Sequence, residues 1–304
     1  MFVSVIMPTY NNLEILQYSL PAILKQNLDK EHDFEVVLVD DGCNKKNKKF
    51  IASVNDQRLK VVALEKNSGR SIARNRGIKR AQGEVLVFLD SDVTARVDLI
   101  QEHLNTLGIS GKNSRIQPLV SSGRLINVYR LQDIGNSKYK LRDFSAAHFA
   151  TGNSAVHRSF LERVQEDPKG PFDEKNFSVY GWEDLELGIR LASLSLKYRR
   201  SEAFGYHYCP PFDLEKIPVY MRKEAERAHT ANRFYRKHPT LNVRLMTQKT
   251  FFHRLLWELL TLGGLFNEKT LTPLLKWLIK KNRHDLAEAL ARHTFLNLNY
   301  VRHL

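Results

Sequence analysis

One stretch, Val85–Asp92, constrains the fold more than any other part of the chain. It reads Val-Leu-Val-Phe-Leu-Asp-Ser-Asp, and an apolar run that ends in polar residues is typical of a buried strand of a parallel sheet. Asp90 and Asp92 lie two residues apart, so in extended backbone both carboxylates would point to the same side. Such a pair could hold a hard divalent cation and leave positions open for phosphate oxygens. Taken alone, the pair is equally compatible with a solvated turn.

Strand and helix patterns alternate along the first hundred residues. Strands are predicted at Phe2–Met7, Phe34–Val39 and Leu59–Leu64, with a helix after the first, capped by Asn11 or Asn12, and another near Ser71–Ala81. This alternation predicts βαβ units around a parallel sheet, whose ligands bind outside the carboxyl ends of the strands. The polar residues at those ends are Thr9-Tyr10, Asp40-Asp41, Asn67–Arg70 and Asp90/Asp92.

The second half of the chain is less regular before it becomes helical. A helix is expected at Asp98–Thr106, strand material at Pro118–Ser122 and Arg124–Val128, and a further helix after Gly181-Trp182-Glu183-Asp184. Tyr206-His207-Tyr208 indicates an enclosed strand position. From about Phe212 onward, apolar residues at helical spacing predict helices at Ile217–Arg236, Phe251–Leu262, Leu271–Lys281 and Asp285–His293.

Five motifs within residues 1–211 together resemble family 2 glycosyltransferases of the GT-A fold. They are Val-Ser-Val-Ile-Met-Pro-Thr-Tyr-Asn (3–11), Val-Asp-Asp-Gly (39–42), Asn-x-Gly-x-x-x-Ala-Arg-Asn-x-Gly (67–77), Leu-Asp-Ser-Asp (89–92) and Gly-Trp-Glu-Asp (181–184). The last also resembles the acceptor-side motif of galactosyl- and N-acetylgalactosaminyltransferases.

The resemblance implies an α/β fold, GT-A, with a Rossmann-like, mostly parallel sheet flanked by helices. Residues 1–211 would form the catalytic domain, with a nucleotide-sugar-binding half at 1–110 and an acceptor-side half at 111–211. Residues 212–304 match no family motif and are expected to form a basic amphipathic helical extension.

For the donor, the resemblance implies a nucleotide-sugar site on the first half. The family holds the nucleoside at Thr9 and Tyr10, reads the uracil edge with the residue that aligns with Asp41, and leaves Asp40 to brace the loop. Arginine forks match phosphate oxygens, and Arg74 aligns with the arginine of the family's Ala-Arg-Asn motif. The full set of expected donor-site residues is Pro8, Thr9, Tyr10, Asn11, Asp41, Asn67, Gly69, Arg70, Arg74, Asp90 and Ser91.

By the same resemblance, Asp90 contacts the ribose or the metal, and Asp92 ligates Mn²⁺ or Mg²⁺. His207 is expected to complete the metal shell, although a single histidine among 11 is often only structural. Asp184 would deprotonate the acceptor hydroxyl. Glu183 would bind the acceptor and Trp182 would stack on its sugar ring; the alternative is an acidic helix start beside a core tryptophan.

Charge and apolar residues are unevenly distributed. The net charge is +14, and residues 213–304 hold 17 Lys/Arg against 8 Asp/Glu, a net +9, which predicts anionic partners. The tryptophan-containing, basic stripes in residues 250–281 could pack on the protein, form a homodimer or lie on a membrane.

Two cysteines without metal spacing and no apparent signal or spanning segment favour a cytosolic protein, with peripheral contact to the inner face of a membrane as a further option.

These patterns predict a metal-dependent, inverting glycosyltransferase that moves a hexose or N-acetylhexosamine from a UDP-sugar to a saccharide or lipid-linked acceptor. One alternative is a sugar-1-phosphate nucleotidyltransferase, although Pro8–Asn12 lacks the expected glycine-rich loop. Another is a non-catalytic basic protein that binds acidic polymer or a membrane surface. A nucleic-acid partner is not expected, because no nucleic-acid-binding motif is present.

Overall fold

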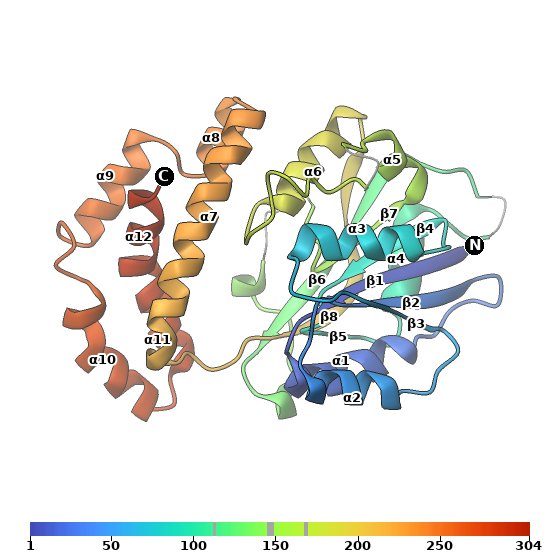
Figure 1. Ribbon diagram of the computed structural model, residues 1–304, viewed down its shortest axis with the longest axis horizontal. Helices are drawn as coiled ribbons and strands as arrows, with labels where there is room; N and C mark the ends of the chain where they lie inside the picture. Colours follow the sequence, from blue (N-terminus) through green and yellow to red (C-terminus); the bar gives the residue numbers. More distant parts are fainter. Residues whose placement is uncertain (112–113, 145–148, 167–169) are drawn as a thin grey trace. The chain divides into compact units, whose positions relative to one another are not determined.

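The computed structural model of the 304-residue chain describes residues 1–111, 114–144, 149–166 and 170–304. The chain forms two compact units (Figure 1). The α/β unit comprises Met1–Ser178 and Glu183–Cys209, and the helical unit comprises Val179–Trp182 and Pro210–Leu304.

The α/β unit is built on a sheet of eight strands in the order β3-β2-β1-β4-β7-β6-β8-β5. β1 to β4 are mutually parallel, β7 runs antiparallel to both β4 and β6, and β8 is parallel to β6 and antiparallel to β5. The strands are β1 (Phe2–Thr9), β2 (Asp33–Asp40), β3 (Leu59–Ala63), β4 (Val85–Leu89), β5 (Val93–Ala95), β6 (Leu119–Val128), β7 (Asn153–His157) and β8 (Lys197–Tyr208).

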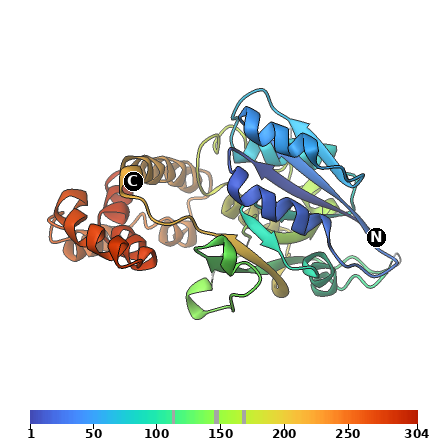
Figure 2. The same ribbon diagram turned by 90° about the horizontal axis from the view of Figure 1, so that it is seen from below.

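Helices cover both faces of this sheet. α1 (Leu13–Leu24) and α2 (Lys45–Ser53) lie below it in Figure 1 and in front of it in Figure 2. Their apolar side chains, with those of α4 (Leu99–Leu107), share one core with Val3, Val5 and Met7. Ile6 points to the second core, which includes side chains of α3 (Arg70–Arg80), α5 (Arg158–Arg163) and α6 (Glu183–Ser193). Alternate side chains of β1 therefore point into two different cores, so both faces of the strand are buried. This explains why its sequence is apolar almost throughout.

The predicted α/β sheet is confirmed, with differences in its second half. β6 is one strand with an irregularity between Ser122 and Arg124, where two strand segments were expected. β5 was not predicted, because three residues are too few to carry a periodic signal. Short 3₁₀ turns follow β6 at Leu131–Asp133 (η1) and Leu141–Asp143 (η2).

The helical unit starts with a 3₁₀ turn at Leu214–Lys216 (η3) and contains α7 (Ile217–Lys237), α8 (Leu241–Met246), α9 (Phe251–Leu260), α10 (Glu268–Lys280), α11 (His284–Ala291), a π-helical turn at Arg292–Leu296 (η4) and α12 (Asn297–Arg302). α12 packs on both α7 and α9 (Figure 1). The four predicted helices are present, whereas α8 and α12 were missed. Within the described residues, no helix has the length and apolarity needed to span a membrane.

Candidate active site

Arg74 lies at the centre of a cluster of charged residues. This arginine is 1% exposed, and its Nη2 donates to Asp90 Oδ1 at 3.0 Å while its Nη1 donates to Glu183 Oε1 at 2.9 Å. Arg74 belongs to α3, Asp90 directly follows β4, and Glu183 opens α6. One guanidinium therefore ties together three segments that are distant in sequence, and it neutralises carboxylates that would be costly to bury alone.

The same cluster sets the pKa values of two aspartates. Burial raises the pKa of Asp90, but the charges of Arg74 and Arg70 outweigh it, and the pKa lies below the usual 3.8. For Asp184, burial and the neighbouring charge of Glu183 raise the pKa to about 6. Its Oδ1 accepts a hydrogen bond from the backbone N–H of Leu185 at 2.8 Å. Asp184 is thus ionised at neutral pH yet basic enough to accept a proton, as a general base must be.

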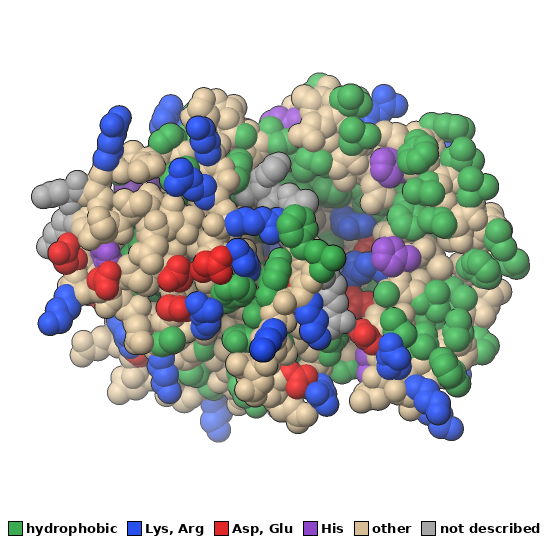
Figure 3. All heavy atoms as spheres, turned by 180° about the vertical axis from the view of Figure 1, so that it is seen from behind, with side chains coloured by type: hydrophobic (Ala, Val, Ile, Leu, Met, Phe, Trp, Pro, Cys, Tyr) green, Lys and Arg blue, Asp and Glu red, His purple; other side chains and the backbone are tan. Residues whose placement is uncertain are grey.

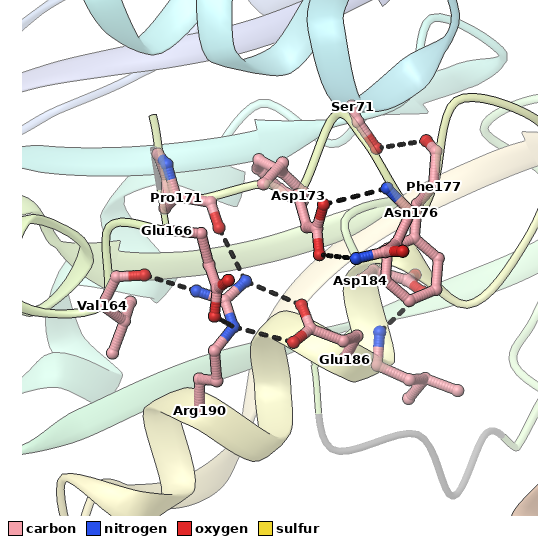
Figure 4. Close-up of polar contacts among 12 residues, drawn as sticks. Ser71, Val164, Glu166, Pro171, Asp173, Asn176, Phe177, Asp184, Glu186 and Arg190 are labelled. Carbon is pink, nitrogen blue, oxygen red and sulfur yellow. Dashed lines mark hydrogen bonds and ion pairs between the residues drawn. The ribbon is translucent and has the colours of Figure 1, made fainter. Parts of the chain in front are cut away.

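The chain around the start of α6 is held by a polar network (Figure 4). Arg190 pairs with Glu186 at 2.7 Å and donates to the carbonyls of Val164 and Pro171. Ser71 Oγ donates to the Phe177 carbonyl at 2.8 Å, which links α3 to the segment before α6. These contacts lie within the α/β unit and hold α6, which carries Glu183 and Asp184, against the neighbouring segments.

Asp92 and His207 form a second polar pair. The His207 Nε2 lies 3.7 Å from Asp92 Oδ2, because β5 and β8 pair Val93 with His207. On the other side of the ring, His207 Nδ1 lies 2.8 Å from Asn127 Oδ1. Asn127 Nδ2 in turn donates to Asp143 Oδ1 at 3.1 Å. This bond turns the amide oxygen of Asn127 toward the ring. Nδ1 of His207 therefore carries a proton that it donates to Asn127, and Nε2 faces Asp92.

This pair fits a divalent cation. Asp92 Oδ1 is buried and has no hydrogen-bond partner, and carboxylate oxygen with imidazole nitrogen suits Mn²⁺. Burial lowers the pKa of His207, but its contacts with Asp92 and Cys209 outweigh burial and raise the pKa to about 11. A cation would therefore compete with a proton at Nε2. The described part of the chain contains no cluster of three or more His, Cys, Asp or Glu arranged to hold a metal.

The loop after β2 is held by Asp40 and Asp41. Asp40 Oδ1 accepts from the Cys43 N–H at 2.7 Å, which is the bracing that the sequence predicts for it. Asp41 is buried, and its two oxygens accept from the N–H groups of Ser68 and Gly69 at 2.7 and 3.1 Å. Burial raises the pKa of Asp41. The contact of Asp41 with a uracil ring stays a prediction, because its visible role is to fix the start of α3.

Residues after β1 adjoin the Asp-Ser-Asp segment. The Thr9 hydroxyl donates to Asn12 Oδ1 at 2.6 Å, and Asn12 Nδ2 donates to Ser91 Oγ at 2.7 Å. Asn12 is the N-cap residue of α1, as predicted, but its side chain makes no capping hydrogen bond. The Asn11 side chain does not cap α1 either; its Oδ1 accepts from the Asn44 N–H at 2.8 Å.

Other residues predicted for the donor site differ in their exposure. Tyr10 is 47% exposed, so its ring is open to a ligand. Asn67 and Arg70 are also exposed, while Pro8 and Gly69 are half-buried.

Three predicted site residues have surroundings that the sequence did not indicate. Arg74 and Glu183 are buried against each other, so their direct contacts with diphosphate and acceptor stay predictions. Trp182 lies in the helical unit, where its indole N–H donates to the Arg227 carbonyl at 3.0 Å and its ring packs on Phe234. The predicted stacking of its ring on an acceptor sugar likewise stays a prediction. The sequence missed Asn127, which no motif marks.

Comparisons with known proteins agree with this fold. The family model "Glycosyl transferase family 2" matches residues 4–165. An uncharacterized glycosyltransferase, YfnE, from Bacillus subtilis is 35% identical over 268 residues, covering 70% of this chain and 66% of that protein. The poly(ribitol-phosphate) beta-N-acetylglucosaminyltransferase TarP of Staphylococcus aureus is 35% identical over 156 residues, covering 50% of this chain and 42% of TarP.

Among solved structures, the mannosyltransferase PcManGT from Pyrobaculum calidifontis, in complex with GDP-Man and Mn²⁺, matches with a TM-score of 0.60 at 17% identity. That match covers 99% of this chain and 85% of the mannosyltransferase. The α/β unit has the GT-A fold. The chain spans 66, 61 and 40% of the length of the first three curated relatives that it matches. Because the family model covers more than half of its residues, the chain belongs to glycosyl transferase family 2.

Proposed function

We propose that this chain is a metal-dependent, inverting glycosyltransferase that moves a hexose or N-acetylhexosamine from a UDP-sugar to a glycan, glycolipid or other surface-molecule acceptor. The observation that carries the proposal is the Arg74 bridge. Arg74 connects Asp90 to the start of the helix that carries Asp184. Asp90 follows the carboxyl end of its strand, and ligands of such sheets bind at that end.

On the donor side, Tyr10 offers an exposed ring for the base, and hydrogen bonds among Thr9, Asn12 and Ser91 join the residues after β1 to the Asp-Ser-Asp segment. Asp92 and His207 would hold Mn²⁺ or Mg²⁺, which supplies Lewis-acid neutralisation of the leaving diphosphate. Exposed Arg70, at the start of α3, adds positive charge beside Asp90. The nucleotide would thus be bound by an aromatic face, a cation and a guanidinium.

On the acceptor side, Asp184 serves as the general base. It takes the proton of the acceptor hydroxyl as that oxygen forms its bond to the anomeric carbon. The bond between the anomeric carbon and the diphosphate oxygen breaks in the same displacement, and its electron pair leaves with UDP. One displacement inverts the anomeric centre, so an α-linked donor gives a β-linked product. The beta-N-acetylglucosaminyl product in the name of the relative TarP has this stereochemistry.

The test is the thermal stability of the chain against UDP, UDP-sugars and GDP-mannose, with and without Mn²⁺, since ligands of the folded state raise Tm. A metal-dependent shift with UDP or a UDP-sugar is expected, and Asp92→Ala should abolish it. Asp29→Ala, at an exposed carboxylate outside the site, is the control and should keep the shift. If no nucleotide shifts Tm, or if Asp92→Ala responds like the wild type, the proposal is wrong.

A further inference from the structure

A group of large apolar side chains in the helical unit points to solvent. They lie on α9, on the loop to α10 and on α10 itself, and we call them the outer face of α9–α10. Their exposed fractions lie between 37 and 79%. The members are Phe251, Phe252, Leu255, Leu259, Leu260, Leu262, Leu265, Phe266, Leu274 and Trp277.

The apolar stripe of α9 is turned away from the protein. Phe251, Leu255 and Leu259 repeat every fourth residue and form one face of the helix, with exposures of 79, 45 and 63%. Trp257 lies on the opposite side, is buried, and belongs to the core with Leu298 and Tyr300. A helix of a globular protein normally directs its apolar stripe to the core. In α9, the stripe of Phe251, Leu255 and Leu259 instead faces solvent.

The loop between α9 and α10 continues this face. Leu262, Gly263 and Gly264 all have positive φ angles, of 49, 69 and 93°, a conformation that is unfavourable for leucine. Leu262 and Leu265 are nevertheless 61 and 58% exposed, so the turn presents apolar side chains to solvent instead of hiding them.

Cations adjoin the apolar residues. Lys276 and Lys280 are exposed on α10, where Trp277 is 55% exposed, and Arg254 is exposed on α9. Residues 251–281 contain five Lys/Arg against two Asp/Glu, and one of those two, Glu258, pairs with Arg302. Figure 3 shows hydrophobic side chains gathered over the helical unit, with lysine and arginine near them.

We infer that the outer face of α9–α10 binds the surface of an anionic lipid bilayer. Apolar side chains with an interfacial tryptophan can enter the boundary between headgroups and acyl chains, while the flanking cations attract anionic headgroups. Charge favours this occupant over a second copy of the chain, because pairing two such faces would bring like charges together. This inference goes beyond glycosyl transfer and does not depend on which sugar is moved.

The experiment is sedimentation of the full chain with sucrose-loaded vesicles. Neutral phosphatidylcholine vesicles are compared with vesicles that also contain phosphatidylglycerol, at low and high salt. We expect binding to the anionic vesicles that weakens with salt. The variant Phe251→Ser/Phe252→Ser, and separately Lys276→Glu/Lys280→Glu, should each lower the partition coefficient by about tenfold or more, since each removes contacts or charge worth about one decade.

Leu141→Ser is the matched control, because Leu141 is 90% exposed but lies in the α/β unit; it should bind like the wild type. All altered residues are exposed, so melting curves should match the wild type and report that each variant is folded. The inference is overturned if the wild type fails to bind anionic vesicles or if the Phe variant binds as well as the control. The inference is also overturned if light scattering shows that the wild type is a dimer and that the Phe251→Ser/Phe252→Ser variant is not, since the outer face of α9–α10 would then join two copies of the chain.

Discussion

Arg74 and Glu183 pair at 2.9 Å although 109 residues separate them in the sequence. Both side chains are nearly inaccessible, at 1 and 4% exposure. The pair therefore links helix α3 to helix α6, with Asp90 as the third member.

Removing Arg74 should destabilise the protein strongly. Arg74→Met leaves the buried Glu183 without its partner, and breaking a buried pair in this way costs roughly 3–5 kcal/mol of unfolding free energy. Denaturant unfolding followed by circular dichroism measures this loss. Arg74→Met/Glu183→Leu should recover part of the stability, because Glu183 is then no longer a buried charge, while Asp90, which is 29% exposed, still lacks its Arg74 partner. Equal stability of the single and double variants would contradict a direct interaction between the two side chains.

Activity should depend on the ionisation of Asp184. Its pKa is about 6, and only the carboxylate accepts a proton, so kcat/KM should fall as pH decreases through about 6 and level off above it. Asp184→Asn should lower kcat by roughly 10²–10⁴. It should not lower unfolding free energy at pH 7.5, because a raised pKa means that the charged form is the costly one in the folded state. A profile that stays flat down to pH 5 would exclude Asp184 as the base.

Asn127 is a positioning residue for the proposed metal site. Asn127→Leu keeps a similar volume but loses the acceptor for the Nδ1 proton of His207, and loss of such a partner typically weakens metal affinity by 10–100-fold. The affinity for Mn²⁺ in the presence of UDP, measured by electron paramagnetic resonance of free Mn²⁺, should fall accordingly. Asn136→Ala, at an exposed asparagine, is the control. Wild-type affinity in Asn127→Leu would show that the hydrogen bond does not orient the ring.

The sheet could be predicted from sequence because local signals decide it. β4 is recognisable by five consecutive apolar residues, all of them buried, and the polar strand ends then indicate where a ligand binds. The partner of Arg74 could not be predicted, because it depends on how α6 packs beside α3. Asn127 was missed for the same reason, since its neighbour His207 is brought close only by the pairing of β6 with β8.

The outward direction of the α9 stripe was also beyond the sequence. Periodicity shows that Phe251, Leu255 and Leu259 share one side of a helix, but it does not tell which side meets the core. Trp257 decides this in the structure, because it packs beside α12 and turns the opposite side to solvent.

Gly42, which directly follows the predicted donor-site residue Asp41, should tolerate alanine poorly. It has φ = 74°, and a Cβ there would lie 2.4 Å from the Lys66 carbonyl carbon and 2.6 Å from the Asn67 nitrogen, so backbone must move in Gly42→Ala. Gly135 has a similar φ of 84°, but a Cβ added there would meet no described atom within 4 Å. Gly135→Ala should therefore cost only the conformational strain, about 1 kcal/mol of unfolding free energy. Gly42→Ala should cost that strain plus roughly 1–3 kcal/mol of unfolding free energy for the clash. The substitution should also raise KM for the UDP-sugar, because the displaced backbone directly precedes Ser68 and Gly69, whose N–H groups bind Asp41. Parallel urea titrations of the two variants measure the difference; equal losses would mean that the approach of the Lys66–Asn67 backbone is not a constraint on residue 42.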